Sequence, residues 1–146
     1  MNFAYYLLVV GAGMSVALQQ VLNAKLRAEL DSPMWAGFVS YFVGVIAMLA
    51  AIALTGEPPL SGAMAARATW SSWTGGIFGA VFIGIAILMV PRLGAAMVLA
   101  LIVVGQMLAS LAFDHFGLLG LAQHPATPIR LVGAAILVLG VVLIRL

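Results

Sequence analysis

Amide side chains stand inside a long apolar stretch near the start of the chain. Gln19 and Asn23 are four residues apart, so on a helix they lie one turn apart on the same face. Gln20 and Ser15 lie within one turn of this pair. A polar side chain inside hydrocarbon is costly unless it meets a partner or water. The stripe therefore predicts either one wall of a solute cavity or hydrogen bonds to a neighbouring helix.

A second polar series occurs in a later apolar stretch, where Gln106, Ser110 and Asp114 follow one another at four-residue spacing. On a helix they share one face that leads to one end. Donors and acceptors that end in a carboxylate suit a polar pathway, and equally a ladder of interhelical hydrogen bonds. His115 follows Asp114, and the two form a candidate proton-handling pair. The simpler alternative is a solvated acid that caps the helix end.

Tyr41 stands in a further apolar stretch, and its hydroxyl needs a partner when it is buried. It is a candidate wall of the same cavity. Since amides and hydroxyls bring no buried charge, a neutral or weakly polar solute is the more natural guest. The candidate cavity residues are Ser15, Gln19, Gln20, Asn23, Tyr41, Gln106 and Ser110.

The sequence lacks the motifs that several kinds of catalytic or binding site require. The chain has no Cys, no His-Glu-x-x-His zinc motif, no Gly-x-Ser-x-Gly elbow and no glycine-rich phosphate loop followed by Lys. Its six basic residues are scattered singly, so no run of them could follow a nucleic-acid backbone. We therefore expect no enzyme, no cofactor, no metal site and no nucleic-acid partner.

The composition indicates which secondary-structure elements carry these polar residues. Hydrophobic residues make up 65% of the chain and charged residues 7%, far below the roughly 25% of a soluble domain. A membrane crossing takes about 20 apolar residues. The sequence predicts an all-α membrane protein, a single domain over residues 1–146, with transmembrane helices at about 3–22, 34–54, 73–90, 94–113 and 129–146.

The orientation of such a protein follows from its basic residues. Five spans place the termini on opposite sides, and one side then carries four basic residues and the other side two: Lys25, Arg27, Arg92 and Arg145 against Arg67 and Arg130. The positive-inside rule favours the first side as cytoplasmic. The small margin predicts a weakly fixed orientation.

Two glycines mark one face of the last span. Gly133 and Gly140 are seven residues apart, which is close to two helical turns. Helices pack in lipid through small residues that allow close backbone approach. The pair predicts a packing seam, either between helices of one chain or between two chains.

Five motifs, in order, resemble one family over nearly the whole chain. They are Gln20-Val-Leu-Asn23-Ala-x-Leu26, Trp73-x-Gly75-Gly76-x-Phe78-Gly79-Ala80, Pro91-x-Leu93-Gly94-Ala95-Ala96, Gly105-Gln106 and Asp114-x-Phe116-Gly117-x-x-Gly120. Together they resemble the YdcZ-like family, a half-length branch of the drug/metabolite transporter superfamily.

The resemblance implies half of an inverted-repeat transporter fold in the bacterial inner (plasma) membrane. Such a half would pair with a second copy in opposite orientation, or with an oppositely oriented paralogue, and would export a small molecule by alternating access. Gly133 and Gly140 also resemble the dimerisation helix of small multidrug resistance transporters. The first span lacks the glutamate of that branch, so proton-coupled cation export is not implied. A non-transporting membrane subunit and a narrow channel are the alternatives.

Overall fold

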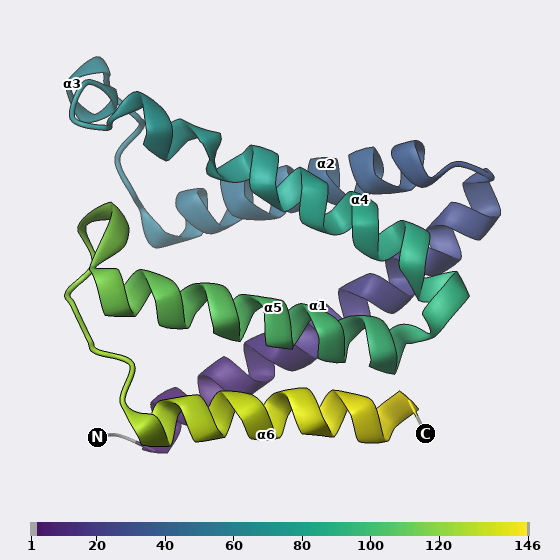
Figure 1. Cartoon of the computed structure of the whole chain (residues 1–146). Helices are drawn as coiled ribbons and strands as arrows, with labels where there is room; N and C mark the ends of the chain where they lie inside the picture. Colours follow the sequence, from purple (N-terminus) through teal and green to yellow (C-terminus); the bar gives the residue numbers. More distant parts are fainter. Residues whose placement is uncertain (1–2, 146) are drawn as a thin grey trace. The chain divides into compact units, whose positions relative to one another are not determined.

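The computed structural model describes residues 3–145, and its long elements are all helices (Figure 1). The chain divides into two compact units, with the boundary between Arg92 and Leu93. The described helices include five that are long and apolar enough to cross a membrane: Phe3–Leu30, Pro33–Thr55, Trp70–Leu93, Ala95–Phe116 and Pro128–Arg145. The predicted all-α fold with five spans is therefore confirmed. The expected helix end at Leu146, like Met1 and Asn2, lies outside the described residues.

The first unit begins with α1 (Phe3–Leu30), which is longer than the sequence predicted. The helix runs past the predicted span end at Leu22, because charged residues end a membrane span without ending a helix. The segment after Leu22 is rich in Ala, Leu, Lys, Arg and Glu, which are good helix formers. Lys25 and Glu29, one turn apart, also form an exposed ion pair at 3.6 Å. Asp31, with φ of 50°, then ends the turn before Pro33.

The next helix, α2 (Pro33–Thr55), has the ends that the sequence indicated. The Ser32 hydroxyl accepts the N–H of Trp35 as an N-cap, and Pro33 takes the first helical position. Gly56 closes the helix in the left-handed conformation, with φ of 70°, and donates its N–H to Ile52.

The last helix of the first unit is α4 (Gly75–Leu93), which follows the short turns α3 (Gly62–Ala65) and η1 (Trp70–Thr74). The helix runs past the predicted span end at Val90 and continues through Pro91 to Leu93. Proline lacks only its own N–H, and a helix near the end of a membrane span tolerates that loss. Gly94, with φ of 81°, is the residue that ends the helical conformation.

A small apolar core joins the three long helices of this unit. Ala36 of α2 and Ile83 and Ile87 of α4 are buried against one another. Leu26 of α1 and Phe82 of α4 pack around them. The core lies at the Leu26 end of α1, so the polar stripe of α1 lies directly beside it along the helix.

The second unit is a pair of helices, α5 (Ala95–Phe116) and α6 (Pro128–Arg145), which lie side by side (Figure 1). The short turn η2 (Leu118–Gly120) lies in their connection. The predicted end of α5 at Phe113 is one turn too early, because Asp114 and His115 remain helical. Gly117, with φ of 60°, ends the helix and donates its N–H to Phe113.

Both units expose apolar side chains along their helices. Leu8 of α1, Phe42 of α2, Phe78 of α4, Leu108 of α5 and Ile136 of α6 are each more than half exposed. An apolar surface of this extent needs lipid or another protein surface to cover it. The exposed faces therefore agree with the membrane assignment.

Candidate functional site

A groove in the first unit collects polar side chains from α1 and α2. Its volume is about 410 Å³, and its polar lining comes from Gln19, Ser40 and Tyr41. Apolar residues of α2 complete the wall: Gly44, Val45, Met48 and Leu49. A mostly apolar hollow with a few convergent polar groups is the usual form of a small-molecule site. We call it the α1–α2 groove.

Ser40 is the lining residue that the sequence reasoning left out of the cavity set. The Gln19 side-chain amide donates a long hydrogen bond of 3.5 Å to the Ser40 hydroxyl. This bond joins α1 to α2 at the polar end of the groove. The available signal was the position of Ser40, a lone hydroxyl beside Tyr41 in an apolar span.

Tyr41 lies against α4 through its hydroxyl. A Cβ added at Gly79 would lie 2.5 Å from the Tyr41 Oη. The absence of a side chain at Gly79 is therefore what admits the tyrosine between the two helices. No described residue forms a hydrogen bond with this hydroxyl.

Gln20 and Asn23 are the buried polar residues of the described chain. Their exposed fractions are 0% and 4%. Both polar atoms of the Gln20 amide, and the Nδ2 of Asn23, lack a hydrogen-bond partner among the described residues. A buried donor or acceptor without a partner costs about 1–3 kcal/mol. These two amides therefore need water, a ligand or another chain to satisfy them.

The other predicted cavity residues are placed differently. Ser15 lies on α1 one turn before Gln19 and is exposed. Gln106 and Ser110 are exposed on α5, which belongs to the second unit. The structure thus brings together Gln19, Tyr41 and the unpredicted Ser40 within one groove.

Asp114 is paired across the end of the second unit. The guanidinium of Arg130, near the start of α6, donates to the Asp114 carboxylate at the end of α5. Arg130 also donates to the carbonyl oxygen of His124, at 2.9 Å. The sequence reasoning used Arg130 only for orientation. Opposite charges at the facing ends of consecutive spans were the signal for this pair.

His115 holds the connecting loop instead of facing Asp114. Its Nδ1 accepts the backbone N–H of Ala126 at 3.1 Å. Its carbonyl oxygen accepts the Gln123 side-chain amide at 2.8 Å. The backbone N–H of His124 reaches the Asp114 carbonyl at 2.8 Å. These bonds fasten the loop back onto α5, so Asp114 and His115 have clear structural roles there.

Removing the Arg130 side chain's charge should release this loop. We expect Arg130→Gln to lower the hydrogen-exchange protection of residues 121–127 about tenfold, equivalent to about 1.4 kcal/mol of local opening free energy. The pair is about one-third exposed, at 34% for Arg130 and 30% for Asp114, so part of its attraction is screened. Exchange measured by mass spectrometry in detergent tests this.

The exposed ion pair of α1 supplies the matched control. Lys25 and Glu29 are 72% and 56% exposed, so Lys25→Gln should leave local exchange nearly unchanged. Asp114→Asn should release the same loop as Arg130→Gln. Equal exchange in wild type and both variants would mean that the ion pair does not hold the loop.

One of the two glycines of the last span, Gly140, lines an open groove. Gly140 lines a hollow of about 450 Å³ between α5 and α6, with Leu137 and Ile144 on the same helix. No described atom would lie within 4 Å of a Cβ added at Gly133 or Gly140. The predicted glycine seam is therefore not filled by packing among the described residues. We call this hollow the glycine groove.

Comparison with known proteins decides the family. Residues 4–143 match the family model described as "Putative inner membrane exporter, YdcZ", of the drug/metabolite transporter group. The chain belongs to the YdcZ family. No curated protein and no solved structure matched it.

YdcZ membership confirms the resemblance drawn from the five motifs. It places the chain in the inner membrane and in a class of transporters instead of enzymes. Within the part of the chain that the structure describes, no three His, Asp or Glu side chains come together as metal ligands. For a YdcZ chain, the polar α1–α2 groove and the two unsatisfied amides are then the natural places to seek solute contacts.

Proposed function

We propose that this YdcZ chain is one half of a small-molecule exporter that works as an antiparallel homodimer by alternating access. The observation that carries the proposal is the pair of buried, unsatisfied amides, Gln20 and Asn23, on α1, the helix that also supplies Gln19 to the α1–α2 groove. Their free donors and acceptor suit a ligand better than a finished core. The family assignment supplies the transport class.

A second copy in opposite orientation would complete an inverted repeat. A site near the midplane of such a repeat is exposed to each side in turn as the halves rock. The weak charge bias, with four basic residues on one side and two on the other, supports both orientations. A paralogue of opposite orientation could take the place of the second copy.

The glycine groove is the contact that we assign to the dimer. Gly133 and Gly140 share one face of α6 and leave room for the close approach of another helix. The apolar exposed face of α6 needs such a cover or lipid.

The proposed substrate is a neutral or weakly polar small molecule. Gln19, Ser40 and Tyr41 present amide and hydroxyl groups in the groove, and no charged side chain lines it. Gln106 and Ser110 of α5 stay in the proposal as further solute contacts. Tight binding of a dication or a dianion would contradict this substrate class.

One observation favours a different function. The Gln19–Ser40 hydrogen bond is the kind of interhelical contact expected in a non-transporting membrane subunit. That function does not explain Gln20 and Asn23. If these amides served interhelical contacts, their polar atoms would have hydrogen-bond partners. A narrow channel would need a polar lining through both membrane halves, whereas the groove's polar residues cluster at one end.

Orientation and pairing can be tested together in one set of fusions. We expect a C-terminal reporter active only in the cytoplasm and a complementary reporter active only outside to give comparable signals. A cysteine at Gly133 or Gly140 should crosslink between chains, and the absence of native cysteine makes each variant a single-cysteine protein. Leu131→Cys, on the opposite face of α6 and 52% exposed, should crosslink weakly.

The outcomes separate the parts of the proposal. Activity of the cytoplasmic reporter alone would overturn dual orientation and direct attention to an oppositely oriented partner. Equal crosslinking at Leu131 and Gly133 would overturn the glycine contact. Flux into vesicles that saturates with solute and shows counterflow would identify a carrier, whereas flux without saturation would identify a pore.

A further inference from the structure

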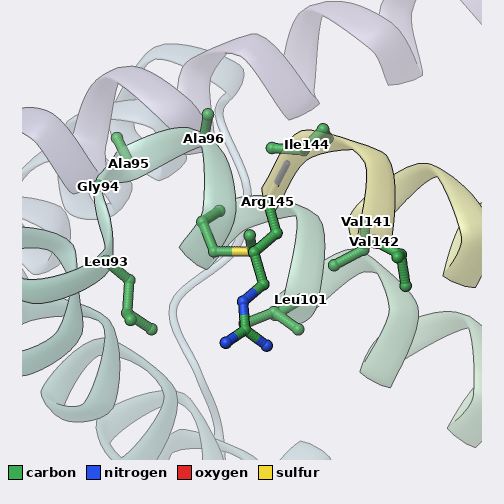
Figure 2. A pocket seen from close by; sticks show the side chains of 10 residues that line it. Leu93, Gly94, Ala95, Ala96, Leu101, Val141, Val142, Ile144 and Arg145 are labelled. Carbon is green, nitrogen blue, oxygen red and sulfur yellow. The ribbon is translucent and has the colours of Figure 1, made fainter.

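A second hollow lies in the α5–α6 unit, at the end where α5 starts and α6 finishes. Its volume is about 770 Å³, within the size range of small-molecule sites. Figure 2 shows its lining side chains. The lining residues are Leu93, Gly94, Ala95, Ala96, Met97, Leu101, Val141, Val142, Ile144 and Arg145. We call this hollow the Arg145 groove.

The Arg145 groove combines apolar walls with one cation. Its other lining residues carry no polar side chain. The Arg145 side chain extends from α6 into the hollow (Figure 2). It forms no hydrogen bond or ion pair with another described residue. An unpaired guanidinium beside apolar walls is complementary to an amphipathic anion.

The first turn of α5 also lines the groove. Val98 is the first residue whose N–H bonds back, to the carbonyl of Gly94 at 3.2 Å. The N–H groups of the three residues before it lack a helical partner, and Gly94 offers no side-chain cap. Ala95 and Ala96 are small enough to let a ligand approach this backbone. The positive end of the helix thus adds to the charge of Arg145.

The groove also has a defined place in the membrane. Arg145 ends the last span and Gly94 precedes the fourth, so both lie at one membrane face. Lys25, Arg27 and Arg92 belong to the same side. A basic pocket between transmembrane helices at the headgroup level is a typical binding place for anionic lipid.

We propose that the Arg145 groove binds one anionic phospholipid. Its phosphate lies at the Arg145 guanidinium, and one acyl chain lies along the apolar lining residues Val141 and Val142. The apolar walls favour a lipid over a soluble phosphate, because an acyl chain lies along them within the hydrocarbon while the headgroup reaches the cation. The site is independent of the solute groove and lies on different helices.

Native mass spectrometry of the full chain in neutral detergent tests this. With dioleoyl phosphatidylglycerol we expect one retained lipid per chain under activation that removes dioleoyl phosphatidylcholine. Arg145→Gln should reduce retained phosphatidylglycerol about tenfold, since a charge-assisted hydrogen bond contributes at least that factor. Arg67→Gln, with the same charge change on the other side, should retain it.

Two further arms distinguish the occupant. Ala96→Leu keeps the charge and fills an exposed position in the groove, so it should also reduce phosphatidylglycerol binding. Glycerol phosphate, which has the headgroup without chains, should not bind. The proposal would be overturned by equal retention of both lipids, or by equal phosphatidylglycerol binding in wild type and Arg145→Gln. Binding of glycerol phosphate would also overturn it, as would a dimer that excludes the lipid while the monomer keeps it.

Discussion

Alanine at Gly79 is expected to destabilise the protein by about 1–3 kcal/mol, the usual cost of adding a methyl group to a packed contact. The added Cβ would lie 2.5 Å from the Tyr41 Oη, which is closer than such atoms can approach. The ring is rigid, so relief requires Tyr41 to rotate about χ1 or χ2 away from its place against α4, or α2 itself to move. Thermal unfolding of the purified protein in detergent measures the loss.

Removal of the Tyr41 hydroxyl should restore the stability of this variant. After Oη is gone, the next atom of the ring, Cζ, is 3.6 Å from the added methyl group, an ordinary contact. Tyr41→Phe alone should be nearly neutral, because no described residue bonds to that hydroxyl. The double variant Gly79→Ala with Tyr41→Phe should therefore be more stable than Gly79→Ala, a coupling that a double-mutant cycle detects.

Another glycine of α4 provides the control. No described atom would lie within 4 Å of a Cβ at Gly84. Gly84→Ala should be neutral or stabilising by up to about 1 kcal/mol, because alanine has the higher helix propensity. If Gly79→Ala and Gly84→Ala unfold at the same temperature, Tyr41 does not lie against Gly79, and the wall of the α1–α2 groove is misplaced.

The contrast between these glycines shows where sequence reasoning stopped. Small residues in a membrane span, such as the glycines of the third predicted span, are typical of a face for close helix approach. Among Gly75, Gly76, Gly79 and Gly84, the structure brings a side chain within 4 Å of an added Cβ only at Gly79. A glycine pattern gives a helix face, but the partner at each position depends on tertiary packing.

The sequence predicted the five long helices, but it did not predict where each helix ends. Five apolar blocks of bilayer length define the spans, because hydrocarbon leaves few alternatives to a helix. The helices run past the predicted span ends at Leu22, Val90 and Phe113 for one shared reason. Charge and proline mark where hydrocarbon ends, whereas the backbone continues until a residue such as Gly94 or Gly117 adopts positive φ.

Polar residues in unusual environments were visible in the sequence where the signal was local. Gln19, Gln20 and Asn23 are conspicuous in an apolar span, and the structure gives each of them an unusual environment. Ser40 and Arg130 were missed as contact residues because their partners are distant in sequence, 21 and 16 residues away. Such pairings follow from how helices pack, and single-sequence periodicity does not contain that information.

The largest functional effect is expected from the two buried amides. Gln20→Met and Asn23→Leu replace each amide with an apolar side chain of similar size. Removing buried groups that lack partners should leave stability equal or raise it by about 1–3 kcal/mol. Transport should fall at least about tenfold, because a polar solute contact worth about 1.4 kcal/mol or more is lost.

The opposite signs of these two effects make the prediction specific. If Gln20 and Asn23 were interhelical contacts, their replacement would break hydrogen bonds and lower stability along with activity. An amide that is hydrogen-bonded only by bound solute lowers the stability of the protein without solute. Replacing such an amide therefore lowers transport and does not lower stability. Unfolding temperature and flux measured on the same preparation therefore distinguish the two roles.

Gln19 supplies the comparison within the same helix. Its amide already bonds to Ser40, at 3.5 Å, so Gln19→Met should lower stability slightly. Export is measured in inverted vesicles with whichever compound of a neutral, weakly polar panel the wild type moves. A stability loss in Gln20→Met and Asn23→Leu would assign the amides to helix packing. Unchanged flux with unchanged stability would mean that water satisfies them, and the solute site would then have to be sought along the exposed Gln106 and Ser110 face of α5.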